Sequence, residues 1–152
     1  MNRMEYDLVG EMAVDADAYY GIHALRAAEN FPITHTRLPG DMIVSMAWIK
    51  KACARANRVT GALSSRVAEA IERACDELID GKLHDQFIVD PIQGGAGTST
   101  NMNANEVIAN RAIELLGGVK GDYTLVHPND HVNCGQSTND IYPPCVKMTL
   151  YR

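Results

Sequence analysis

The chain has 152 residues with 46% hydrophobic and 22% charged composition, which suits one globular domain that buries roughly two thirds of its unfolded surface. Its formal net charge of -5 argues against binding to nucleic acid or an anionic membrane surface, so local groups must hold any anionic ligand. The first residues lack an apolar signal core, and no apolar run approaches the ~20 residues that span a bilayer, so a cytoplasmic protein without a membrane segment is expected.

The first half of the chain predicts a small hairpin followed by helices. Apolar and polar residues alternate around Gly10, which fits two short strands at 6–9 and 11–14. A short helix is expected over 24–30, because Pro32 disfavours helical geometry in the residue before it. Two longer helices are expected at 42–57, after an N-cap at Asp41, and at 64–80, after an N-cap at Ser64.

The second half predicts two more helices separated by irregular segments. A short extended piece is expected at 87–89, where a following proline ends it. Apolar residues at helical spacing predict a helix over 103–116 that stops at a double glycine. Residues 127–130 indicate a turn, and a last helix is expected at 139–152 with two prolines near its first turn. These patterns favour a mainly α fold with a minor β-hairpin.

Two polar stretches are suited to holding an anion. The stretch from Gly94 to Asn110 begins as a glycine-rich loop, carries hydroxyls at Thr98, Ser99 and Thr100, and continues into a helical pattern. Glycines permit a left-handed backbone, and the free N–H groups at a helix start add a positive dipole end. The stretch from Asn133 to Asp140 repeats this design with adjacent hydroxyls before another helix. Two such groups of donors suit a dicarboxylate.

Common nucleotide motifs fit the glycine-rich loop poorly. Residues 95–100 begin like the dinucleotide-binding G-x-G-x-x-G, but threonine replaces the third glycine and Pro91 interrupts the segment before it. A P-loop is excluded because no lysine lies between Lys82 and Lys120. No cofactor is therefore predicted.

Metal and thiol chemistry are weakly indicated. His127 and His131 stand four residues apart with Asp130 between them, a spacing that can chelate zinc on a helix. Pro128 favours a turn there and no further ligand is evident, so we expect a structural role and no metal. The four cysteines form no C-x-x-C pair, so reduced thiols are expected, and Cys134 is interpreted as a buried thiol in preference to a nucleophile.

Long motifs carry a resemblance to a known family. Residues 93–106, 127–133 and 136–140 are similar to the N-terminal part of the aspartase/fumarase superfamily, and the similarity extends back through 16–21 and 26–31. The resemblance therefore covers nearly the whole chain. It implies the helical N-terminal domain of that fold.

Three positions bear on the branch within the superfamily. Class II fumarases usually place serine where Ala96 and Thr138 stand, which favours an aspartase over a fumarase. His127 points the other way, because His-Pro-Asn-Asp is shared with fumarases while some aspartases have asparagine first. A class II fumarase (fumarate hydratase) is thus the alternative to an aspartate ammonia-lyase.

The aspartase resemblance implies reversible elimination of ammonia from L-aspartate to give fumarate. Removing a proton beside the β-carboxylate spreads negative charge onto that carboxylate as an enediolate. Short neutral hydroxyls suit this charge, because their hydrogen bonds can strengthen as it grows. Thr98, Ser137 and Thr138 match family positions that bind the carboxylate, and Asn139 matches one that contacts substrate.

The resemblance also implies which parts of the enzyme this chain lacks. The family's serine base, its substrate-pairing lysine and its threonine-histidine pair lie beyond Arg152, so these residues alone are expected to be inactive. Residues 1–138 correspond to a substrate-loop domain, and 139–152 to the truncated start of the central helical bundle of a homotetramer. A secondary anion site is implied at His127, Asn129 and Asp130.

A free-standing dicarboxylate-binding domain is the rival from a different functional class. Such a domain would keep both polar stretches without the catalytic half, so the residues present do not separate the two hypotheses. The codons that follow Arg152 do separate them, and mixing full-length protein with fumarate and either ammonia or water separates an aspartase from a fumarase.

Overall fold

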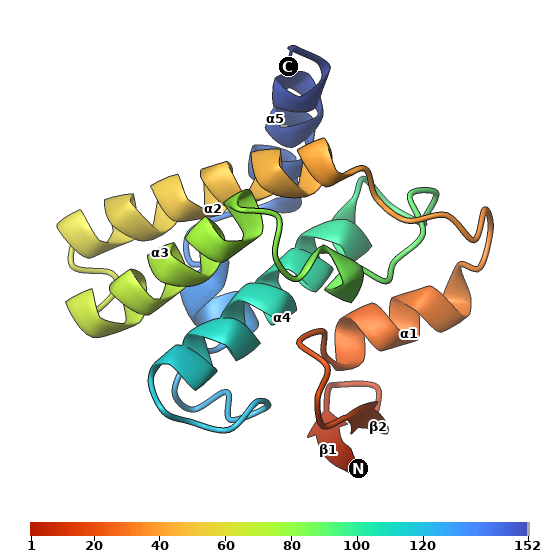
Figure 1. Ribbon diagram of the computed structural model, residues 1–152, viewed down its shortest axis with the longest axis horizontal. Helices are drawn as coiled ribbons and strands as arrows, with labels where there is room; N and C mark the ends of the chain where they lie inside the picture. The colour runs from red at the N-terminus through yellow and green to blue at the C-terminus, as the bar shows by residue number, and fades with distance from the viewer. Residues whose placement is uncertain (152) are drawn as a thin grey trace.

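The computed structural model describes residues 1–151, and they form a mainly helical fold with one two-stranded sheet (Figure 1). The long helices α2, α3 and α4 pack against one another, α1 lies against α4, and α5 projects from the body beside α2 (Figure 1). The α-helices are α1 (Ile22–Asn30), α2 (Gly40–Val59), α3 (Ser65–Ile79), α4 (Thr98–Leu115) and α5 (Thr138–Tyr151). A short 3-10 helix, η1, spans His84–Gln86, and one π-helical turn, η2, spans Pro128–Val132.

The hairpin exists, but its first strand lies earlier than predicted. Strand β1 (Asn2–Tyr6) pairs antiparallel with β2 (Glu11–Asp15), so that Tyr6 faces Glu11. The predicted strand at 6–9 was wrong, because Asp7 begins a turn there. Its carboxylate accepts the backbone N–H groups of Val9 at 2.8 Å and Gly10 at 3.0 Å. An aspartate that bonds its own backbone in this way favours a turn over a strand.

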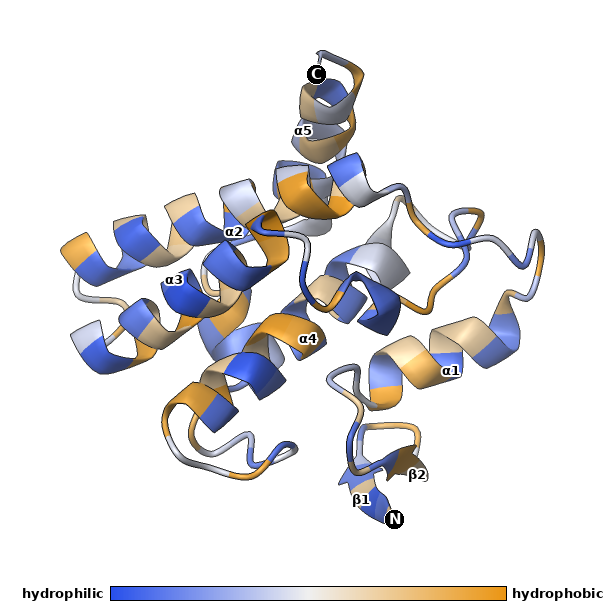
Figure 2. Ribbon diagram, viewed as in Figure 1, coloured by the Kyte–Doolittle hydropathy of each residue, from blue (hydrophilic) through white to orange (hydrophobic). Residues whose placement is uncertain are grey.

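The core lies between α2, α3 and α4. Ile71, Ala74 and Leu78 of α3 are buried at helical spacing, and the cap predicted for this helix is confirmed, since Ser64 Oγ accepts the N–H of Val67 at 3.3 Å. In Figure 2, hydrophobic segments recur along α3 and α4, which pack together. No helix of residues 1–151 has the length and apolar character needed to cross a membrane.

The start of α2 differs from the prediction. The helix begins at Gly40 with Pro39 as its N-cap residue, and no side chain caps it. The predicted N-cap at Asp41 was therefore wrong, because the observed N-cap residue lies two positions earlier. Asp41 lies inside the first turn, where a carboxylate interacts favourably with the positive end of the helix dipole.

Helix α4 begins at Thr98 and not at residue 103, so the hydroxyl residues belong to its first turn. Asparagines that disfavour a helix are accommodated because distant backbone groups bond to them. Asn103 Oδ1 accepts the N–H of Ile88 at 2.9 Å, and Asn103 Nδ2 donates to the carbonyl oxygen of Gln86 at 3.1 Å. Residues 87–89 are held by this asparagine and pair with no strand.

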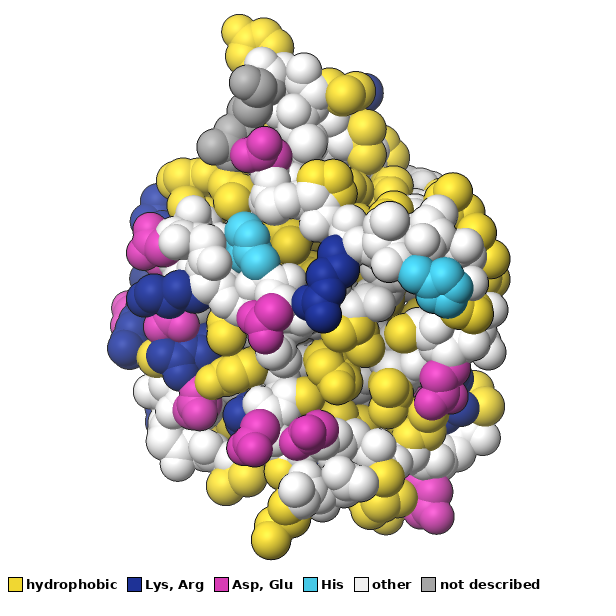
Figure 3. All heavy atoms as spheres, turned by 45° about the vertical axis from the view of Figure 1, so that its right-hand side comes forward, with side chains coloured by type: hydrophobic (Ala, Val, Ile, Leu, Met, Phe, Trp, Pro, Cys, Tyr) yellow, Lys and Arg dark blue, Asp and Glu magenta, His cyan; other side chains and the backbone are white. Residues whose placement is uncertain are grey.

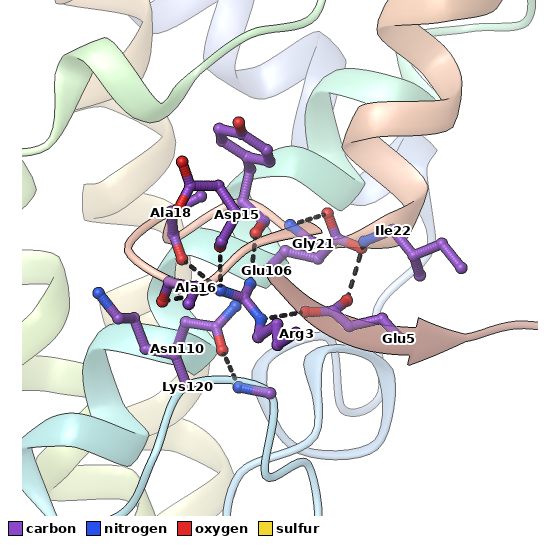
Figure 4. Close-up of polar contacts among 12 residues, drawn as sticks. Arg3, Glu5, Asp15, Ala16, Ala18, Gly21, Ile22, Glu106, Asn110 and Lys120 are labelled. Carbon is purple, nitrogen blue, oxygen red and sulfur yellow. Dashed lines mark hydrogen bonds and ion pairs between the residues drawn. The ribbon is translucent and has the colours of Figure 1, made fainter. Parts of the chain in front are cut away.

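Two buried carboxylates hold the start of α1 (Figure 4). Glu106 of α4 accepts the backbone N–H groups of Gly21, His23 and Ala24 at 2.8 to 3.0 Å. Glu5 of β1 accepts the N–H of Ile22 at 2.9 Å. These four N–H groups are the ones that a helix start leaves unpaired, so the hairpin and α4 together cap α1.

The last predicted elements are close to those observed. The turn predicted at 127–130 overlaps η2, whose N-cap residue is His127, and α5 begins at Thr138, with Pro143 and Pro144 inside the helix. Both prolines lie in the second turn of α5, where each lacks the N–H that would pair with the carbonyl oxygen four residues earlier. The end of this predicted helix, Arg152, falls outside the described residues.

Candidate functional site

The starts of α4 and α5 meet at Gly97. Its φ of +87° is left-handed, and a Cβ added there would lie 2.2 Å from the ring of Tyr142 in α5. Both the backbone conformation and the close approach therefore require glycine. This contact places the first turn of α4 against the first turns of α5, so the two predicted groups of hydroxyls lie on adjoining helix starts.

The three hydroxyls at the start of α4 are not equivalent. Thr100 is fully buried, its N–H donates to Gln93 Oε1 at 2.9 Å, and its Oγ1 accepts from Gln93 Nε2 at 2.6 Å. Thr100 therefore fixes the glycine-rich loop and is not a donor for a ligand. Thr98 is exposed and Ser99 is half-buried. Within residues 1–151 their backbone N–H groups have no protein partner, so both remain available to an anion.

The start of α5 is capped by its own sequence. Ser137 donates its N–H to Asp140 Oδ2 at 2.9 Å, and Asp140 donates its N–H back to the carbonyl oxygen of Ser137. The backbone N–H and hydroxyl of Ser137 lower the pKa of Asp140 below its ordinary value. Thr138 and Asn139 are the next two residues, and within the described chain their N–H groups have no protein partner. Thr138, Asn139 and Ser137 thus lie together at one helix start.

A buried lysine that the sequence interpretation missed lies beneath this start. Lys50 of α2 is 0% exposed, and its Nζ donates to Asn133 Oδ1 and Gln136 Oε1, each at 2.8 Å. Asn101 of α4 also donates to Asn133 Oδ1, at 3.2 Å. The segment before Ser137 is therefore fixed to α2 and α4. The available signal was a lysine within the apolar run of the predicted helix 42–57.

The predicted secondary anion site is organised by two histidines. His127 Nδ1 accepts the N–H groups of Asn129 and Asp130, each at 3.2 Å, and His131 Nδ1 accepts the N–H of His127 at 2.8 Å. Both rings thus carry their proton on Nε2. The N–H groups at this turn are already paired, the side chains of Asn129 and Asp130 are exposed, and that of His127 is partly exposed.

Within residues 1–151, the candidate site residues neither belong to a metal-binding cluster nor line the cavity described below. Within residues 1–151 no group of three or more His, Cys, Asp or Glu side chains is placed to hold a metal ion. The described cysteines are free thiols, and burial raises the pKa of Cys145 to about 11. A cavity of about 220 Å³ opens beside Phe31, Arg37 and Asp90, and none of the predicted substrate-binding residues lines it.

Comparisons with known proteins connect this geometry to a family. A family model described as lyase matches residues 10–152. The aspartate ammonia-lyase of Bacillus subtilis (strain 168) is 55% identical over 99% of this chain, which covers 32% of that relative. The aspartate ammonia-lyases of Helicobacter pylori (strain J99) and Escherichia coli (strain K12) are 56% and 51% identical over 98% of the chain, again covering 32% of each.

Solved structures share the fold. Fumarate lyase:delta crystallin from Brucella melitensis in native form superposes with a TM-score of 0.97 at 52% identity, over 99% of this chain and 36% of that one. A class II fumarase from Schistosoma mansoni superposes with a TM-score of 0.93 at 38% identity, over 99% and 32%. The chain spans about a third of the length of the curated relatives it matches.

Proposed function

Because the chain belongs to the lyase family, we propose that it is the N-terminal part of an ammonia-lyase that converts L-aspartate reversibly to fumarate and ammonia. The observation that carries the proposal is the pair of adjoining helix starts, joined at Gly97 and Tyr142, with hydroxyls and free N–H groups on both. The identity of 51 to 57% to proteins named aspartate ammonia-lyase supports the choice of substrate.

In this proposal the hydroxyls bind the carboxylate that receives charge. Thr98 contributes from α4, Ser137 and Thr138 contribute from α5, and Asn139 contacts the substrate beside them. Neutral donors at two helix starts stabilise an enediolate more than the ground-state carboxylate, because their bonds strengthen as charge develops. Ser137 is already ordered by Asp140, so it need lose little freedom on binding.

The proton is taken by a group outside this chain. None of the residues assigned to binding is a base of suitable strength, and positioned donors stabilise an enediolate only after a base has formed it. The isolated 152 residues should therefore bind a dicarboxylate without turning it over. His127, Asn129 and Asp130 are proposed as a secondary anion site, with His127 Nε2–H as its donor.

We place the enzyme in the cytoplasm as a homotetramer, with a dicarboxylate and not a nucleic acid as its ligand. Leu150 and Tyr151 of α5 are 83% and 94% exposed, and Figure 3 shows hydrophobic side chains on this projecting helix. In the proposed enzyme α5 continues into the helical bundle, where later residues of the same chain and neighbouring subunits would cover these side chains.

A fumarase is the second candidate, favoured by the likeness to the Schistosoma mansoni enzyme at 38% identity. The test is to mix full-length protein with fumarate and either ammonium or water alone, and to follow fumarate absorbance and the product formed. We expect aspartate with ammonium and no malate. Malate without aspartate would overturn the proposal in favour of the hydratase.

A further inference from the structure

Lys50 is a fully buried lysine whose ammonium group bonds only to neutral side chains. Its Nζ donates to two amide oxygens, and no Asp or Glu of residues 1–151 lies within ion-pair distance of it. Amide oxygens replace only part of the hydration that a buried ammonium loses. A helix position in the core thus carries a costly charge where an apolar side chain would pack, which indicates a role beyond stability.

The acceptors of Lys50 belong to the segment that leads into the proposed carboxylate site. Asn133 and Gln136 are bonded to each other as well, since Asn133 Nδ2 donates to the carbonyl oxygen of Gln136 at 3.0 Å. Ser137 follows directly. Asn101, in the first turn of α4, joins the same network through Asn133 Oδ1. The Lys50 ammonium therefore holds the segment before α5. It is also linked to the start of α4, because Asn133 Oδ1 accepts from both Lys50 and Asn101.

The groups around Lys50 leave its positive charge uncompensated. The titratable side chains that face it are the thiols of Cys53 in α2 and Cys75 in α3, and burial raises the pKa of both, so both are neutral near pH 7. The side chains of α4 and of the segment 133–136 that enter its hydrogen-bond network are the amides of Asn101, Asn133 and Gln136. Asp140 of α5 acts on Cys53, but within residues 1–151 it forms no ion pair with Lys50. Desolvation lowers the pKa of Lys50 to about 7. A bound anion nearby would favour the protonated amine, and the protonated amine would equally favour the anion.

We propose that Lys50 is a positioning residue of the carboxylate site, holding the segment 133–136 that presents Ser137 and Thr138 and supplying a buried positive charge that couples dicarboxylate binding to proton uptake. This inference rests on the proposed function. The coupling makes binding strongest where Lys50 is protonated, and binding weakens as the pH rises through the range in which the free protein loses that proton.

The first test measures succinate binding by calorimetry at pH 6 and pH 9 in full-length protein. Lys50→Met keeps the length of the side chain and removes the charge. Lys51→Met is the matched control, because Lys51 is its neighbour in α2 and pairs with Asp76 of α3 instead of with Asn133 and Gln136. Wild type and Lys51→Met should bind at least about tenfold more weakly at pH 9, whereas Lys50→Met should change less than about threefold. Equal pH dependence in all three would overturn the coupling.

The second test measures hydrogen exchange of residues 133–138 without any ligand. We expect exchange to be at least about tenfold faster in Lys50→Met than in Lys51→Met. Unchanged exchange would overturn the positioning role, whatever the enzyme's substrate proves to be. Wild-type protein that binds no succinate would instead overturn the proposed carboxylate site. Should Lys50→Met not fold, Gln136→Leu removes one acceptor of the lysine and is expected to accelerate the same exchange.

Discussion

The starts of α1 and α4 show two opposite uses of the same helix chemistry. At α1 the unpaired N–H groups are satisfied by carboxylates of the protein itself, three by Glu106 and one by Glu5. At α4 the N–H groups of Thr98 and Ser99 have no partner within residues 1–151. A helix start closed by internal carboxylates supports the fold, whereas an open one keeps its positive end for a ligand. The difference is that Glu106 and Glu5, both distant in sequence, bond to the start of α1, whereas within residues 1–151 no such carboxylate bonds to the start of α4.

The strongest way to break the closed start is Glu106→Ala. The side chain is 1% exposed, and its removal leaves three N–H groups, two of them buried, and the His23 ring without their acceptor. We expect the free energy of unfolding to fall by about 3 to 5 kcal/mol, measured by urea denaturation. Glu69→Ala is the control, because Glu69 forms only an exposed ion pair with Arg58 and its loss should cost less than about 1 kcal/mol. Equal losses would refute the assigned capping role.

The contact that holds the starts of α4 and α5 together is tested by Gly97→Ala. The new Cβ meets the Tyr142 ring and demands a left-handed backbone, so we expect a loss of about 2 to 4 kcal/mol in unfolding free energy. Gly61→Ala shares the positive φ, at +78°, but has no atom within 4 Å, so it should cost only about 1 kcal/mol. If the two substitutions cost the same, the contact with Tyr142 contributes nothing.

The proposed carboxylate donors at the starts of α4 and α5 are tested by Thr98→Ala, Ser137→Ala and Thr138→Ala in full-length protein. Each should lose a hydrogen bond to a charged group, worth about 1.5 to 3 kcal/mol, or roughly ten- to a hundredfold in kcat/KM. Fumarate absorbance follows the rate, and circular dichroism checks that the fold persists. Thr124→Ala is the control, since this exposed threonine bonds only to Asp122. Variants at full speed would contradict the assignment of these hydroxyls to the enediolate.

The smallest expected effect is a pH dependence at the closed start. The hydrogen bond to Glu106 raises the pKa of His23 above its usual 6.5. This contribution to stability is therefore present below pH 6.5 and lost as the pH rises through the higher folded-state pKa. The His23 side chain is 42% exposed, so solvent screening limits the effect. His23→Ala should flatten the stability profile between pH 6 and 8, and an unchanged profile would refute the coupling.

Local patterns predicted the elements whose causes are local. The helix at 64–80 was predicted with its cap because Ser64 bonds to Val67, only three residues away. The start of α4 was misplaced because Gln93 and Gln86 bond to Thr100 and Asn103, and no periodicity reports such pairs. Hydropathy alone predicts a loop at 98–103, because most of these side chains are polar.

The candidate site was predictable from its motifs and not from hydropathy. Glycine and hydroxyl residues before helical patterns indicated the two polar stretches, and the resemblance to the aspartase/fumarase superfamily selected within them the hydroxyls of Thr98, Ser137 and Thr138 and the amide of Asn139, whose roles stay a prediction. Lys50 was missed, because a lysine within an apolar run is ordinarily assigned to the exposed face of a helix. Its acceptors lie more than eighty residues away in the sequence, at Asn133 and Gln136.

The capping of α1 also limits where this domain can be divided. Removing the hairpin and α1 would leave Glu106 without the N–H groups that it accepts, and Asn110 would lose the Tyr19 carbonyl oxygen at 2.9 Å. Both side chains lie on α4, the helix that begins at Thr98. An expressed protein that starts after residue 30 is therefore expected to aggregate or unfold. The first thirty residues contain none of the proposed substrate contacts. They are nevertheless needed to fold α4, the helix that carries Thr98.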